Sequence, residues 1–132
     1  VERARARERA GDPVVRQEIA RLIAMQRANQ WTAQRAHAAR ATGKAPGPEG
    51  SIGKLALSNV ARQSAKVHSL IAGADGMLGG DVIAEVLISV PAQSIAGGTD
   101  EIQRNIIGER ALGLPREPDP SKGQPYREVR NK

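Results

Sequence analysis

The residues best suited to chemistry form one short run, Gly97-Gly98-Thr99-Asp100-Glu101, at the predicted start of a helix. Two glycines before a helix let a ligand approach the backbone N–H groups that the first helical turn leaves free. Thr99 is a typical N-cap residue, and the carboxylates of Asp100 and Glu101 complement the positive end of the helix dipole. Because these carboxylates would repel a phosphate, two interpretations stay open: contact with a neutral polar group such as a ribose hydroxyl, or a plain tight turn.

Elsewhere the residue types and spacings indicate no catalytic constellation. The chain has no cysteine, which excludes a disulfide framework, a thiolate zinc site and a cysteine nucleophile. Its two histidines, His37 and His68, are too few for a histidine-rich metal site, so we expect no metal. His68 lies near the apolar stripe of a predicted helix, and we interpret it as a packing or capping residue.

Four predicted helices must position the glycine-containing turn. Most of them have a capping residue at the start, and all have apolar residues at helical spacing and a Gly or Pro near the end. They are expected from Pro13 to just before Gly43, from Pro48 or Ser51 to Ala72, from Asp81 to Pro91, and from Thr99 to Gly113. No segment alternates apolar and polar residues in the manner of a strand. The sequence therefore predicts an all-α fold of the antiparallel four-helix-bundle type, with an extended tail.

Composition agrees with a small helical domain. Hydrophobic residues make up 39% of the 132 residues, and alanine alone accounts for 21 positions, which suits closely packed helices. Residues 1–115 are expected to form the bundle, with its first helix truncated, and residues 116–132 an extended proline-rich tail. Four arginines near the N-terminus alternate with other residues, and we interpret this end as solvated and frayed.

Charge and hydropathy limit the partners. The net charge is +6, and residues 1–48 are basic whereas residues 73–111 are acidic, so the two parts can attract each other within one fold. Only 2% of the residues are aromatic, which argues against a nucleic-acid-binding surface. No apolar run is long enough to span a membrane, and the first residues lack the apolar region of a signal peptide. We therefore expect a cytoplasmic protein with neither a nucleic-acid nor a membrane partner.

The stretch 94–115 resembles the C-terminal signature of the acyl-CoA dehydrogenase family of FAD-dependent enzymes. The specific matches are Gly98-Thr99, Glu101-Ile102-Gln103-Arg104 and Arg110. Residues 12–20 are similar to the start of a long helix in that family's C-terminal domain, and the tail looks like that of bacterial members. The resemblance implies a four-helix bundle that forms the C-terminal third of an enzyme, without the preceding helical and β domains.

The same resemblance implies roles for individual residues. Gly98 matches the glycine near the acyl thioester, and Thr99, Asp100 and Glu101 match positions that touch FAD. Gly73 is the retained glycine of a Gln-x-x-Gly-Gly segment that contacts a neighbouring subunit's FAD, while Leu70 and Ala74 depart from that pattern.

The position of the usual catalytic base is also altered. Many family members place a Glu immediately before the Gly-Thr pair, and this sequence has Gly97 there. A glycine cannot accept a proton, so we expect no catalytic residue within this chain.

Three hypotheses for function follow. The favoured one is the C-terminal part of an FAD-dependent acyl-CoA dehydrogenase, which introduces a double bond between the α and β carbons of an acyl-CoA. Such a part would contribute flavin contacts and the interface of a homo- or hetero-oligomer, a dimer or a tetramer. The alternatives are a non-catalytic subunit or relative that uses the bundle only for oligomerisation, and a free-standing helical interaction module. We expect the chain alone to be inactive.

Overall fold

The computed structural model describes residues 1–78, 82–116, 118 and 121–129, and these residues contain helices and turns but no strand. The all-α prediction is confirmed. The α-helices are α1 (Glu2–Ala6), α2 (Pro13–Ala41), α3 (Glu49–Ala72), α4 (Val82–Ser89), α5 (Asp100–Ala111) and α6 (Tyr126–Val129), and two 3₁₀ segments are η1 (Gly73–Met77) and η2 (Val90–Ser94).

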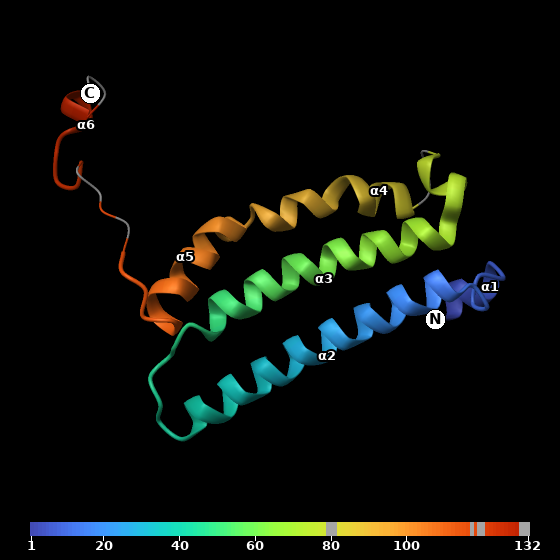
Figure 1. Cartoon of the computed structure of the whole chain (residues 1–132), viewed down its shortest axis with the longest axis horizontal. Helices are drawn as coiled ribbons and strands as arrows, with labels where there is room; N and C mark the ends of the chain where they lie inside the picture. The colour runs from blue at the N-terminus through green and yellow to red at the C-terminus, as the bar shows by residue number, and fades with distance from the viewer. Residues whose placement is uncertain (79–81, 117, 119–120, 130–132) are drawn as a thin grey trace.

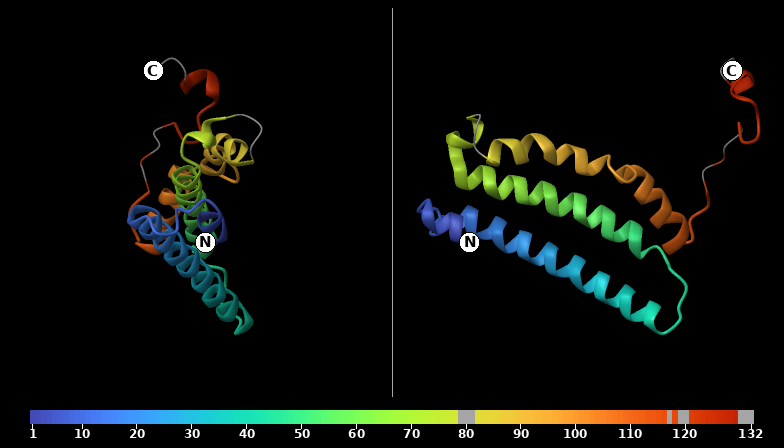
Figure 2. Two further views of the ribbon diagram at one scale, coloured as in Figure 1. Left: turned by 90° about the vertical axis from the view of Figure 1, so that its right-hand side faces the viewer. Right: turned by 180° about the vertical axis from the view of Figure 1, so that it is seen from behind.

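Helix α3 lies in the middle of the fold. Figure 1 shows α2 running antiparallel to α3 on one side, while α4, η2 and α5 return along its other side as a nearly continuous rod. The view from behind in Figure 2 gives the same order of three antiparallel rods. The tail that carries α6 leads away from them. Because α3 touches both neighbours, residues on its packed faces can connect parts of the chain that are distant in sequence.

The start of α2 follows the predicted capping chemistry. The Asp12 carboxylate accepts hydrogen bonds from the backbone N–H groups of Val14 (2.8 Å) and Val15 (3.3 Å), and Pro13 occupies the first turn. The helix then runs unbroken for 29 residues and ends just before Gly43, which has a φ of +81°. Both predicted boundaries of this helix are confirmed.

The third predicted helix differs from the structure in its second half. The α-helical pattern ends at Ser89, and Val90–Ser94 continue as a 3₁₀ segment around Pro91. Pro91 has no N–H to donate, so it ends the α-helix as predicted, but the chain keeps its direction in the tighter 3₁₀ form. The proposed cap of this helix, Asp81, lies outside the described residues.

The prediction of a frayed N-terminus is wrong. Residues 2–6 form helix α1, and Ala4 is only 1% exposed in a cluster with Val15, Val67 and Ile71. An ion pair of 2.6 Å between Arg7 and Asp75 adds a link between this end and η1. The small alanine side chain lets α1 approach α2 and α3 closely, a tertiary contact that local sequence cannot reveal.

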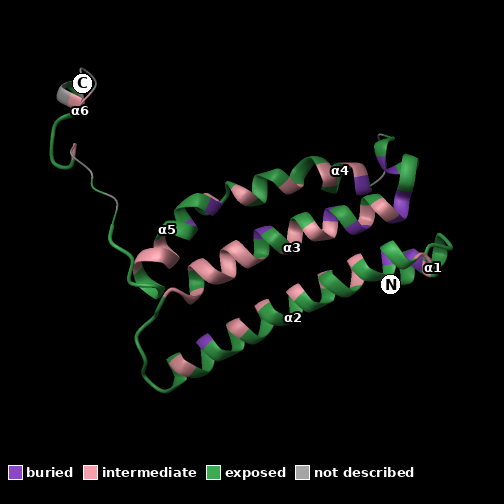
Figure 3. Cartoon of the chain, viewed as in Figure 1, coloured by how far each residue is buried: buried purple, intermediate pink, exposed green. Residues whose placement is uncertain are grey.

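Few side chains are fully buried. Figure 3 shows most of the surface of α2 as exposed, with buried residues gathered where α1, α2 and α3 meet and along α3. This distribution matches the thin, alanine-rich core expected from the composition. None of the described helices is long and apolar enough to cross a membrane.

The core cluster makes a first prediction. Ile71 is 6% exposed, so Ile71→Ala should lower the free energy of unfolding of the 132-residue chain by about 2–5 kcal/mol, measured by urea denaturation. The matched control is Ile95→Ala, at a residue that is 67% exposed, which should change it by less than about 0.5 kcal/mol. Equal losses in the two variants would contradict the position of the core.

Candidate functional site

The turn before α5 contains two consecutive glycines in left-handed conformations. Gly97 has a φ of +67° and Gly98 a φ of +93°, a region that side-chain-bearing residues rarely adopt. Helix α5 then begins with Thr99 as its N-cap, whose Oγ1 accepts a hydrogen bond from the N–H of Ile102 at 3.2 Å. The predicted cap is confirmed, and both glycines are exposed.

Gln103 holds this turn from within α5. Its side chain is 6% exposed, and its amide Nε2 donates a hydrogen bond to the Gly97 carbonyl oxygen at 3.3 Å. A Cβ atom added to Gly98 would lie 2.7 Å from the same Nε2, closer than real Cβ contacts allow. Gly98 therefore has two physical reasons to be glycine, the backbone conformation and the close approach of Gln103.

The carboxylate of Asp100 is buried and bound by two cations. Asp100 is 3% exposed, and its oxygens lie 3.0 Å from Lys54 Nζ and 2.9 Å from Arg62 Nη1. Burial by itself raises the pKa of this carboxyl group, but the hydrogen bonds from Lys54 and Arg62 and the charge of Lys54 outweigh it and hold the pKa well below the usual range. The group is therefore charged at neutral pH.

The α3 side chains that bind η2 and the start of α5 lie on one face of α3. Lys54, Ser58 and Arg62 are spaced four residues apart, which places them one above another on a helix. Ser58, 1% exposed, donates to the Gln93 carbonyl oxygen at 2.9 Å. Arg62 donates to Ser94 Oγ as well as to Asp100. We call Lys54, Ser58 and Arg62 the α3 polar stripe; it contacts residues on both sides of the turn.

Our sequence interpretation missed the α3 polar stripe and Gln103. A signal was present, because three polar residues at a spacing of four interrupt a helix that is otherwise largely small and apolar. Spacing alone could not show that the stripe faces η2 and α5, because its partners lie 32 to 46 residues away.

The structure brings most of the predicted site residues together. Gly97, Gly98, Thr99, Asp100 and Glu101 share one turn, and Glu101 is exposed, with its carboxylate 3.3 Å from Arg104. The exposed glycine backbone, Thr99 and Glu101 can all be reached by a ligand, whereas the Asp100 carboxylate is already occupied by Lys54 and Arg62.

Gly73 lies apart from this turn. It is the C-cap of α3, 19 residues beyond Lys54, or about 28 Å along the helix axis. Its φ is +61°, so the chain leaves α3 in a conformation that favours glycine. Within one copy of the chain, Gly73 and the turn therefore cannot touch the same small ligand group.

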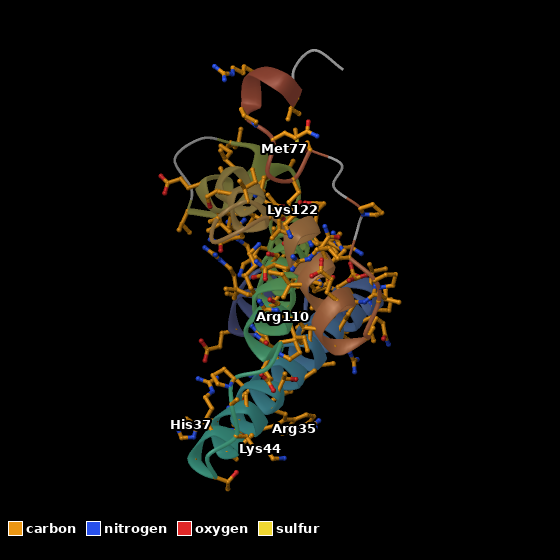
Figure 4. All side chains as sticks on the ribbon, turned by 90° about the vertical axis from the view of Figure 1, so that its left-hand side faces the viewer. Arg35, His37, Lys44, Met77, Arg110 and Lys122 are labelled. Carbon is orange, nitrogen blue, oxygen red and sulfur yellow. The ribbon has the colours of Figure 1, made fainter. Side chains whose placement is uncertain are left out.

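The two histidines lie outside the turn. His68 is half-buried, and its Nδ1 donates to the Ser64 carbonyl oxygen at 2.8 Å, in keeping with the interpretation as a packing or capping residue. His37 is exposed near the end of α2, in the region where Figure 4 also shows Arg35 and Lys44. Among the residues that the structure describes, no cluster of His, Asp or Glu side chains could hold a metal ion.

The fold and the turn agree with one known family. The family described as "Acyl-CoA dehydrogenase, C-terminal domain" matches residues 1–112, which is most of the chain. This chain therefore belongs to the acyl-CoA dehydrogenase family and corresponds to its C-terminal domain.

Two relatives carry the same family name. The chain is 34% identical over 127 residues to the acyl-CoA dehydrogenase IpdE1 of Mycobacterium tuberculosis, and 34% identical over 125 residues to that of Mycolicibacterium smegmatis. Each match covers 89% of this chain, but only 31% and 30% of the respective relative. The chain thus spans about a third of the length of the relatives it matches. No solved structure matches it at a significant level.

The two glycines of the turn make a second prediction. Gly97→Ala should lower the free energy of unfolding of the 132-residue chain by about 1–2 kcal/mol, because its φ of +67° is strained for alanine but its Cβ meets no atom within 4 Å. Gly98→Ala should cost about 2–3 kcal/mol, because a φ of +93° is strained for alanine and because the end of the Gln103 side chain must move away, which breaks its hydrogen bond to the Gly97 carbonyl oxygen. Urea denaturation of both variants checks the order, and a larger loss at Gly97 would contradict it.

The lowered pKa of Asp100 makes a third prediction. A carboxyl group whose pKa is lower in the folded state contributes its full stabilisation above its unfolded pKa, about 3.9 for aspartate, and loses it as the pH falls towards the folded value. Asp100→Asn should therefore be less stable than the wild type at pH 7, and the difference should shrink as the pH falls below about 4.

Thermal unfolding of both proteins across this pH range tests the prediction. The pKa of Glu18 is also lowered, most by a hydrogen bond from Lys66 and next by one from Gln63. Because Glu18 is present in both proteins, its contribution to stability cancels when the two are compared. A difference that stays constant with pH would show that the Asp100 charge does not stabilise the fold.

Proposed function

We propose that this chain is the C-terminal helical domain of an FAD-dependent acyl-CoA dehydrogenase, where it supplies flavin and thioester contacts and part of an oligomer interface. The observation that carries the proposal is the turn itself. Gly97 and Gly98 present exposed backbone directly before α5, in the stretch that resembles the family signature, and buried polar contacts fix its shape. The sequence resemblance, the family membership and the names of both relatives support the same reaction class.

The turn suits contact with neutral parts of a flavin and with a thioester. FAD, when bound, would accept a hydride from the β carbon of an acyl-CoA. In this chain, Thr99 and Glu101 are accessible enough to contact the cofactor, and the exposed backbone of Gly98 is accessible to an acyl thioester. The Asp100 carboxylate is held by Lys54 and Arg62, so we assign Asp100 a contact through its backbone rather than its side chain.

The proton acceptor is proposed to lie outside these 132 residues. Abstraction of the α-proton requires a positioned base, and Gly97, at the place where many family members carry a Glu, has no side chain to act as one. What the chain contributes is binding and orientation by the turn. A second candidate function is a subunit that keeps the bundle but has lost catalysis. It is favoured by three departures from the family pattern, at Gly97, Leu70 and Ala74.

An oligomer is proposed from the surface of α4. This helix is apolar at six of its eight positions, yet only Ile83 is fully buried and Ile88 is 82% exposed. A helix that is apolar on nearly all sides is normally covered by a neighbour. We assign this face to contacts with another subunit of a homo- or hetero-oligomer, in which Gly73 would approach the neighbour's FAD.

A fourth prediction tests the function directly. The purified full-length protein should show the visible absorbance of an oxidised flavin, or acquire it when FAD is added, and should reduce that flavin with an acyl-CoA. The 132-residue chain alone should show no turnover with any acyl-CoA and an electron acceptor. A full-length protein that binds no flavin would support the non-catalytic subunit instead, and turnover by the short chain would contradict the proposed division of labour.

A further inference from the structure

We propose that Arg62 is a positioning residue that clamps the loop of residues 95–99 from both ends, and so sets the geometry with which Gly98 and Thr99 meet their ligands. The functional half of this inference rests on the function proposed above. Arg62 itself belongs to α3 and contacts neither Gly98 nor Thr99 through any hydrogen bond among the described residues. Its effect must pass through the two residues that it binds.

The clamp consists of one guanidinium and three acceptors. Nη1 of Arg62 donates to Ser94, the last residue of η2, and to Asp100, the first residue of α5, at 2.9 Å. Nη2 donates to Asn59 Oδ1 at 2.7 Å, one turn earlier on the same helix, which fixes the orientation of the planar group. One side chain thus joins the two ends of the five-residue loop.

Neighbouring contacts make the clamp stiff. Ser58 binds the Gln93 carbonyl oxygen at 2.9 Å on the entry side, and Lys54 binds Asp100 at 3.0 Å on the exit side. Each of these fixes one side of the loop only. Arg62 is the one side chain, among the described residues, that binds both sides directly. Its removal should loosen Ser94 relative to Asp100, while Ser58 and Lys54, which are hydrogen-bonded to each other at 3.2 Å, keep each side attached to α3.

A loop with two left-handed glycines needs such a restraint. Glycine has the largest conformational freedom of all residues, so Gly97 and Gly98 cannot hold one shape by themselves. Gln103 fixes the Gly97 carbonyl from inside α5, but this contact lies on the exit side. Because a displacement of about 1 Å in a binding group can reduce turnover a hundredfold, a restraint across the whole loop has a direct functional consequence.

Arg62→Met in the full-length protein tests the clamp, with Lys66→Met as the matched control. Lys66 lies one turn further along α3, is similarly exposed (52% against 42% for Arg62) and also forms an ion pair, to Glu18 of α2 at 2.7 Å, but it contacts no part of the loop. Both variants remove one half-exposed cation from α3. Loss of a half-exposed cation and of a helix-to-helix ion pair is therefore common to both variants, and what distinguishes Arg62→Met is the loss of the contacts to Ser94 and to the buried Asp100.

Two measurements separate the clamp from its function. Hydrogen exchange followed by mass spectrometry needs no flavin, and the amides of residues 95–99 should exchange about tenfold faster in Arg62→Met and unchanged in Lys66→Met. In the flavin-loaded protein, Arg62→Met should raise the Kd for FAD or lower kcat by about tenfold and shift the flavin absorbance bands, with Lys66→Met unchanged. Ser94→Ala removes the contact of Arg62 on the entry side of the loop but keeps its contact with Asp100, so it should accelerate exchange less than Arg62→Met does.

The outcomes are distinct. Unchanged exchange in Arg62→Met, or equal acceleration in Lys66→Met, overturns the clamp. If Arg62→Met exchanges faster but keeps the flavin spectrum, Kd and kcat of the wild type, the positioning role is overturned and the clamp is supported. A wild-type protein that binds no flavin overturns the proposed function and with it the positioning role, and the exchange result alone then decides whether Arg62 holds the loop.

Discussion

The burial of one carboxylate organises the turn between η2 and α5 and its contacts with α3. An ionised aspartate that is 3% exposed is tolerable only when cations and hydrogen bonds replace the water it has lost, and Lys54 and Arg62 supply them. Removal of either cation would leave charge in a poorly hydrated place. The register of α5 against α3 is thereby fixed, since a rotation of either helix would separate the charges.

This ion pairing gives the charge pattern of the sequence a structural meaning. The attraction expected between the basic residues 1–48 and the acidic residues 73–111 is realised between Arg7 and Asp75, whereas Asp100 pairs with Lys54 and Arg62, which lie between these two parts of the sequence. The first pair is exposed and of little weight, whereas the second is buried and specific. The overall charge distribution therefore matters less than the position of a single acidic residue at the start of α5.

What could be predicted from sequence was local. Asp12, Pro13 and Thr99 determine helix starts through their own side chains, and Pro91 ends the α-helical part of its segment, so these boundaries followed from residue types alone. The burial of Ala4 and the pairing of Arg62 with Ser94 and Asp100 depend on how α3 is rotated towards its neighbours, which no short window of sequence contains. The resemblance supplied the family, but not the means by which the turn is held.

The left-handed backbone at Gly97 limits how this position can change during evolution. A change from a glycine codon to a glutamate codon can require a single nucleotide, so the genetic code sets little obstacle to gaining or losing a carboxylate at this position. The φ of +67° makes it costly, because glutamate would enter a loop whose shape α3 and Gln103 already impose. A substitution at position 97 therefore requires the whole loop and its anchors on α3 to change with it. Relatives with and without an acidic residue at this position should differ in the backbone conformation of the loop as well as in one side chain.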